Sequence, residues 1–105
     1  MDVDIFYAKN GLIGFQKYKG MSESNYAFHL IFMDLHMKVM DGEESTKCIR
    51  EYEKANNLPS SIIIGLTADV SPFVKIHCIE IGMDDYIAKP IRYKQYKDLI
   101  YKIIV

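Results

Sequence analysis

The chain lacks the features that mark several large classes of protein. Its longest apolar runs have the length of a β-strand and fall far short of the ~20 residues that a membrane helix needs. The N-terminus has no basic start of the kind found in signal peptides. The net charge is −1 and the sequence pI is about 6.3, so there is no basic field to hold nucleic acid. We therefore expect a soluble, intracellular (cytoplasmic) domain with neither a membrane nor a nucleic-acid partner.

Cysteine is also scarce. Cys48 and Cys78 lie thirty residues apart, with neither CxxC spacing nor the density of a disulfide scaffold. We expect both thiols to be reduced and buried as small hydrophobic groups. The 105 residues contain no internal repeat and suit one domain with one core, covering residues 1–105.

Short apolar runs alternate with helical patterns along the whole chain. Asp41 and Glu44 fit a helix start, Ser71-Pro72 fits another, and Gly82 fits a helix end. The expected strands cover residues 5–8, 30–34, 62–67 and 83–88, and the expected helices open at residue 10, at 41, at 72 and at 91, with a loop over 20–25. Since parallel strands need crossover connections, this order predicts an α/β fold with a parallel sheet and helices on both faces.

Three strand ends carry chemically useful side chains. Asp34 ends the run Leu30 to Asp34, Thr67 ends the next strand, and Lys89-Pro90 follows the last. Taken alone, Asp34 fits a turn residue better than a site residue. The carboxyl ends of parallel strands share one edge, however, so the three side chains are expected to converge. A carboxylate nucleophile, a hydroxyl donor and an ammonium group are what a transferred phosphoryl group requires.

Three longer segments contain these residues and carry a resemblance to a known family. The segments 33–42, 65–69 and 82–90 together resemble a response-regulator receiver domain, of the type attached to hybrid histidine kinases. The resemblance covers nearly the whole chain and implies a flavodoxin-like fold. It also implies a phospho-acceptor in a His-to-Asp phosphorelay, a part of two-component signal transduction, rather than a metabolic enzyme. The implied partner is a histidine kinase or a histidine phosphotransfer protein.

The resemblance assigns a role to individual positions. It makes Asp34 the phospho-acceptor, Thr67 the switch hydroxyl, Lys89 the phosphate-contacting lysine and Tyr86 the switch aromatic residue. It implies Mg²⁺ as cofactor, held by Asp34 and by the main-chain carbonyl of His36. Two other functions remain open: a pseudo-receiver that only binds proteins, and a small phosphatase that uses Asp34 as nucleophile. The phosphatase is disfavoured because no second acid stands two residues after Asp34.

The chain departs from the family pattern at its start. Receiver domains open with a strand that ends in an acidic pair for Mg²⁺, and this chain begins at the second strand. Asp2 and Asp4 lie at the wrong end of the expected strand over residues 5–8, more than about 10 Å from Asp34. We therefore expect a receiver fold of four strands and four helices that lacks the first strand-helix unit and its acidic pair. That loss would leave two strand edges unpaired and a gap in the core.

Lys38 is a second departure from the family pattern. It replaces the usual proline, and we interpret it as a solvated loop lysine.

One helix face is a candidate partner surface. On the helix from Pro72, Ile76 and Ile79 lie roughly opposite the expected buried face. The resemblance places an output or dimer partner on the face formed by residues 72–104. Incidental surface hydrophobic residues explain the pattern equally well.

Overall fold

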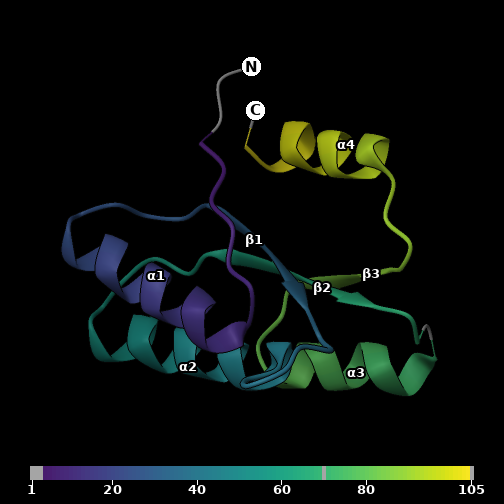
Figure 1. The fold of residues 1–105 in the computed structure, drawn as a ribbon, viewed down its shortest axis with the longest axis horizontal. Helices are drawn as coiled ribbons and strands as arrows, with labels where there is room; N and C mark the ends of the chain where they lie inside the picture. Colours follow the sequence, from purple (N-terminus) through teal and green to yellow (C-terminus); the bar gives the residue numbers. More distant parts are fainter. Residues whose placement is uncertain (1–3, 70, 105) are drawn as a thin grey trace.

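The computed structural model describes residues 4–69 and 71–104 of the chain. It shows three β-strands and four α-helices in these residues, arranged around one sheet (Figure 1). In chain order they are α1 (Gly11–Glu23), β1 (Leu30–Asp34), α2 (Gly42–Ala55), β2 (Ile62–Thr67), α3 (Pro72–Glu80), β3 (Asp85–Ala88) and α4 (Tyr93–Ile103).

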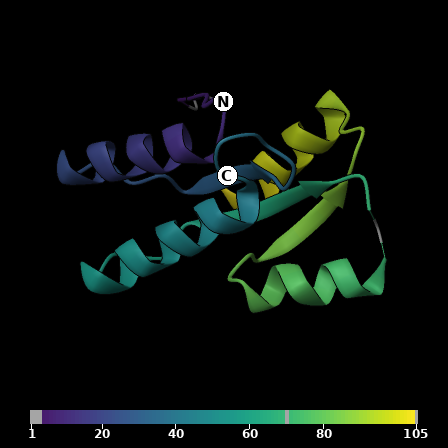
Figure 2. The same ribbon diagram turned by 60° about the horizontal axis from the view of Figure 1, so that its bottom comes forward.

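The sheet is parallel, with the strand order β1-β2-β3. Helices α1, α2 and α3 lie on one side of it, and α4 lies on the other (Figures 1 and 2). In both views α1 runs beside α2, while α3 lies under β3. The α/β class and the helices on both faces are therefore confirmed.

Side-chain caps begin the helices where the sequence predicts them. The carboxylate of Asp41 accepts a hydrogen bond from the Glu44 N–H, which satisfies one of the free N–H groups at the start of α2. Ser71 caps α3 in the same way. Gly82 follows α3 with a φ of 111°, a left-handed conformation that glycine adopts at little cost. These boundaries are local features, and the sequence predicted them correctly.

The prediction of a fourth strand over residues 5–8 is wrong. The described residues from 4 to 9 form no strand, and no strand of the described chain pairs with them. The segment is instead held by aromatic packing, with the Phe6 ring 5.5 Å from Tyr26 and 5.4 Å from Phe28. A strand requires a neighbouring backbone about 4.8 Å away, and an apolar pattern alone does not supply one.

Three other boundaries differ from the sequence prediction. Helix α1 continues through the expected loop as far as Glu23, because one glycine at position 20 costs a formed helix only about 1 kcal/mol. Strand β3 begins at Asp85 and helix α4 at Tyr93, each two residues later than expected. None of these shifts moves a predicted site residue away from its strand end.

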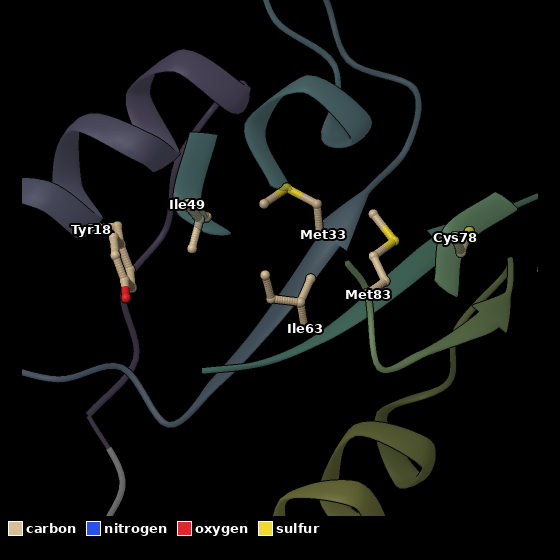
Figure 3. Close-up of a cluster of buried hydrophobic side chains, with 6 residues drawn as sticks. All are labelled: Tyr18, Met33, Ile49, Ile63, Cys78 and Met83. Carbon is tan, nitrogen blue, oxygen red and sulfur yellow. The ribbon is translucent and has the colours of Figure 1, made fainter. Parts of the chain in front are cut away.

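The hydrophobic core lies between the sheet and helices α1 to α3. Figure 3 shows its central side chains, which come from these elements and from the turn between α3 and β3. They are Tyr18, Met33, Ile49, Ile63, Cys78 and Met83. Both cysteines carry free thiols, but only Cys78 is fully buried, and Cys48 is half-buried. Helix α4 contributes no fully buried side chain, so the face of the sheet that it covers is packed less completely.

A buried polar network ties the helices to the amino end of the sheet. The carboxylate of Glu53, 3% exposed, accepts hydrogen bonds from the Tyr18 hydroxyl at 2.9 Å and from the Ser61 N–H at 2.8 Å. The Arg50 guanidinium group donates to Glu53 at 2.8 Å and to Asp84 at 3.0 Å. Because each charge has a partner, the network links α1, α2 and the loop before β3 without an unpaired buried charge.

Candidate functional site

The register of the sheet brings the predicted site residues to one edge. Asp34 is aligned with Leu66 across β1 and β2, and Thr67 with Ala88 across β2 and β3. Lys89 directly follows Ala88, and its Nζ lies 2.7 Å from Oδ1 of Asp34. The structure thus joins two residues that are 55 positions apart in the sequence.

A shallow cleft of about 570 Å³ opens over this ion pair. Its walls come from the ends of all three strands and from α4. The lining residues are Asp34, Leu66, Ala68, Lys89, Pro90, Ile91 and Tyr96. The side chains of Asp34 and Lys89 are each 34% exposed, so both remain accessible to a group that enters the cleft.

The surroundings of Asp34 favour its ionised form. Partial burial raises the pKa of its carboxyl group, but the hydrogen bonds from the Lys89 ammonium and from the His36 N–H outweigh this and lower the pKa below its usual value. The His36 N–H lies 2.9 Å from Oδ1. Asp34 is therefore a carboxylate at neutral pH, as a nucleophile must be.

Thr67 is fully buried beside this pair. Its Oγ1 accepts a hydrogen bond from the Asp69 N–H at 3.1 Å, and its main-chain carbonyl accepts one from the Lys89 N–H at 2.7 Å. The side chain is only 1% exposed and does not line the cleft. Thr67 is thus linked to Lys89 through the main chain, and its hydroxyl holds the loop that follows β2.

Tyr86 lies apart from the other three predicted residues. It sits next to Gly65 across the β2–β3 pair, is half-buried, and packs against the hydrophobic core. It does not line the cleft over Asp34. The structure therefore brings together Asp34, Lys89 and the main chain of Thr67. Tyr86 lies outside the cleft, against the hydrophobic core.

Sequence reasoning did not assign the aromatic residue Tyr96 to the cleft. Tyr96 of α4 lines it, and the Tyr96 ring meets the Phe32 ring edge to face at 4.7 Å. The sequence showed Tyr96 only as part of the apolar face of a helix, and no local signal assigned that face to Asp34. The peptide bond between Lys89 and Pro90 is cis.

The residues present suit Mg²⁺ only in a minimal way. Within residues 4–69 and 71–104 no group of three His, Cys, Asp or Glu side chains is placed to hold a metal ion. Asp34 supplies one carboxylate, and the adjoining main chain at His36 can supply a carbonyl. Mg²⁺ is commonly held by one or two carboxylates and otherwise by water, so this donor set fits a weak site.

The fold and the paired carboxylate and ammonium group define a flavodoxin-like α/β domain of the receiver class. The family model described as "Response regulator receiver domain" matches residues 2–101, and the chain belongs to this family. It is a receiver domain of phosphorelay signalling.

Proteins of similar sequence support this assignment. The chain is 39% identical over 98 residues to hybrid signal transduction histidine kinase F of Dictyostelium discoideum, covering 92% of this chain and 8% of the kinase. It is 38% identical over 79 residues to the peroxide stress-activated histidine kinase mak2 of Schizosaccharomyces pombe, covering 74% of this chain and 3% of that protein. The chain thus spans less than a tenth of the length of these relatives.

Solved structures agree with the fold. The receiver domain of Ssk1 from Saccharomyces cerevisiae, crystallised with the histidine phosphotransfer protein Ypd1, is similar with a TM-score of 0.80 and 33% identity, over 91% of this chain and 68% of that one. The receiver domain of the sensor kinase PA1611 from Pseudomonas aeruginosa has a magnesium ion coordinated in its active site cleft. It is similar with a TM-score of 0.68 and 28% identity, over 96% of this chain and 76% of that one. No helix in the described part of this chain is long and apolar enough to cross a membrane.

Proposed function

We propose that Asp34 accepts a phosphoryl group from a phosphohistidine on a histidine kinase or a histidine phosphotransfer protein. The observation that supports this most directly is the ion pair between Lys89 Nζ and Asp34 Oδ1 at the floor of an open cleft. It keeps the carboxylate ionised and sets a positive charge where the charge of an arriving phosphoryl group develops. The complex of the Ssk1 receiver with Ypd1 supports a partner of this kind.

The transfer requires an in-line displacement at phosphorus. A carboxylate oxygen of Asp34 attacks the phosphorus atom, and the phosphorus–nitrogen bond breaks with its electron pair left on nitrogen. Because the other ring nitrogen of the phosphohistidine carries a proton, the histidine leaves as the neutral imidazole. Lys89 then moves its hydrogen bond from the carboxylate to a phosphoryl oxygen. Mg²⁺, held by Asp34 and the His36 carbonyl when it is bound, would neutralise part of the negative charge. The domain turns over no metabolic substrate in this scheme, since the phosphoryl group stays on Asp34.

The new state is expected to be read through Thr67 and Tyr86. The Thr67 hydroxyl now accepts from the Asp69 N–H, and it becomes a hydrogen-bond donor to the phosphoryl group when the loop after β2 moves. Tyr86 packs against the core next to Gly65 and would follow this movement. Signal output would then leave through the face formed by residues 72–104, where Ile76 and Ile79 are 57% and 48% exposed.

Intact-mass spectrometry after incubation with acetyl phosphate and Mg²⁺ tests the proposal. We expect one phosphoryl group on the native chain, none on Asp34→Asn, and one on the matched control Asp98→Asn, whose exposed carboxylate lies on α4. Transfer from phosphorylated Ypd1 should show the same pattern. If the folded native chain takes up no phosphoryl group from either donor, the acceptor role fails and the pseudo-receiver function takes its place.

A further inference from the structure

The cleft over Asp34 contains a hydrogen-bond donor that the ion pair does not use. Among the described residues that line this cleft, only Lys89 and Tyr96 carry a donor on the side chain. Lys89 already bonds to Asp34 at 2.7 Å. The hydroxyl of Tyr96, on α4, has no role in the site as the sequence predicted it.

Tyr96 lies on the face of the sheet from which the Asp34 side chain projects. Its ring meets the Phe32 ring edge to face at 4.7 Å. Phe32 and Asp34 are two residues apart on β1, so their side chains leave the same face, about 7 Å apart along the strand. Met33, between them, packs into the core on the opposite face. The contact with Phe32 therefore places the Tyr96 ring beside the position of the acceptor.

The direction of α4 turns the Tyr96 side chain toward this position. The helix begins at Tyr93, and the residues just before it, Pro90 and Ile91, line the cleft. Its N-terminal end therefore lies near the carboxyl edge of the sheet, the edge at which Asp34 ends β1 (Figure 2). Side chains on a helix lean toward its N-terminus, so the phenol ring of Tyr96 leans toward that edge.

A second cleft, of about 770 Å³, also touches these residues. Asp34, Leu66 and Tyr96 line both clefts, so they stand together where the two meet. Tyr96 is half-buried, and its hydroxyl has no hydrogen-bond partner within the residues that the structure describes. The ring therefore has open space beside it, and its hydroxyl is available to a group bound at Asp34.

We propose that the Tyr96 hydroxyl donates a hydrogen bond to an oxygen of the phosphoryl group as that group reaches Asp34. This inference rests on the proposed function. The phosphoryl group brings three outer oxygens into the cleft, and the Lys89 ammonium group holds one of them. The Thr67 hydroxyl is buried, accepts from the Asp69 N–H, and reaches the group only after the loop that follows β2 has moved. Tyr96 already lines the cleft, so it acts on the transfer itself.

Tyr96→Phe tests the hydroxyl alone, because it keeps the ring against Phe32. Phosphorylation by acetyl phosphate with Mg²⁺ should be about tenfold slower than in the native chain, as expected for the loss of one neutral hydrogen bond in the cleft. The matched control is Tyr93→Phe on the same helix. Tyr93 is 81% exposed and does not line the cleft over Asp34, so this variant should react at the native rate. Circular dichroism establishes that both variants are folded.

Two phosphoryl donors separate contact with the phosphoryl group from contact with a protein partner. Tyr96→Phe should slow uptake from acetyl phosphate and from phosphorylated Ypd1 by the same factor. Slowing with Ypd1 alone would overturn the inference, because Tyr96 would then contact the donor protein. A native rate with both donors, while Asp34→Asn takes up nothing, would overturn it and leave the acceptor role of Asp34 intact. If the native chain takes up no phosphoryl group, the inference fails together with the proposed function.

Carbon-13 NMR distinguishes direct contact from a structural effect of the substitution. In a chain whose tyrosines are labelled at Cζ, the carbon that carries the hydroxyl, the Tyr96 signal is identified by its absence in Tyr96→Phe. This signal should shift when acetyl phosphate and Mg²⁺ are added to the native chain, and the Tyr93 signal should stay in place. Neither signal should shift in Asp34→Asn under the same conditions. A Tyr96 signal that stays in place in the phosphorylated native chain would overturn the inference, whatever the rate of Tyr96→Phe.

Discussion

The Nζ of Lys89 and Oδ1 of Asp34 lie 2.7 Å apart across the carboxyl edge of the sheet. No other ion pair in the described part of the chain includes a residue that lines the cleft over Asp34 and Lys89. In the proposed function the pair combines a nucleophile with the charge that its product requires, so most consequences of that function can be tested at these two positions.

Lys89→Gln should slow phosphorylation of Asp34 about 100-fold, because removal of one positioned donor from a charge-developing site has an effect of this size. The same change should raise the pKa of Asp34, since the Lys89 hydrogen bond favours the carboxylate. The rate is measured with acetyl phosphate, and the pKa by NMR titration of the Asp34 carboxyl carbon. Lys75→Gln, on the exposed surface of α3, is the matched control and should change neither quantity.

The stability of the domain should depend on Asp34 at acid pH. The folded-state pKa of Asp34 is lowered, so its contribution to the free energy of unfolding is fully present above the unfolded value near pH ~4 and is lost as pH falls through the folded value. Asp34→Asn removes this group, so the free energy of unfolding of the variant should fall less than that of the native chain as the pH drops below about 4. Urea denaturation at several pH values measures both slopes. Equal slopes would mean that the ion pair does not contribute.

Glu53→Ala should lower the free energy of unfolding by about 3–5 kcal/mol, because it leaves the Tyr18 hydroxyl and the Ser61 N–H without their partner and the Arg50 charge partly uncompensated. Urea denaturation is the measurement. Glu51→Ala, an exposed position on the same helix, should change stability by no more than about 0.5 kcal/mol. A loss of similar size in both variants would contradict the role of the network.

The same network predicts an unusual tyrosine titration. Burial, followed by the hydrogen bond and the charge of Glu53, raises the pKa of Tyr18 to about 12. Ultraviolet titration of the native chain, compared with that of Tyr18→Phe, should show one tyrosine that ionises with a pKa of about 12. In Glu53→Gln the negative charge is gone but the burial remains, so the pKa of Tyr18 should fall below 12 while staying above the ordinary value of 10.0. An unchanged pKa in that variant would leave burial as the whole cause.

Two glycine substitutions should have opposite effects. A Cβ at Gly42 would overlap the main-chain carbonyl of Asp34, so Gly42→Ala must displace α2 or the end of β1. We expect a loss of about 1–3 kcal/mol in the free energy of unfolding and slower phosphorylation of Asp34. A Cβ at Gly20, within α1, meets no atom within 4 Å, and Gly20→Ala should stabilise the domain by about 0.5–1 kcal/mol. Thermal or urea unfolding compares the two, and a stabilising Gly42→Ala would contradict the close approach.

Sequence reasoning succeeded where the signal is local. Asp41, Ser71 and Gly82 each bound a helix through contacts within a few residues, and the structure shows them where they were expected. It failed at residues 5–8, whose apolar pattern is that of a strand but whose backbone pairs with no strand of the described chain. It also missed Tyr96, because the contact with Phe32 joins a helix and a strand that are far apart in the sequence.

Apart from residues 5–8, the sequence by itself determined the element types, their order, and the placement of Asp34, Thr67 and Lys89 after apolar runs, because hydrophobic period and capping chemistry act over a few residues. Only the tertiary structure decided that Lys89 bonds directly to Asp34, that Thr67 and Tyr86 stay outside the cleft, and that residues 5–8 form no strand. Hydrogen-bond ladders and ion pairs depend on how distant segments are placed in space, and periodicity along the chain carries no information about that placement.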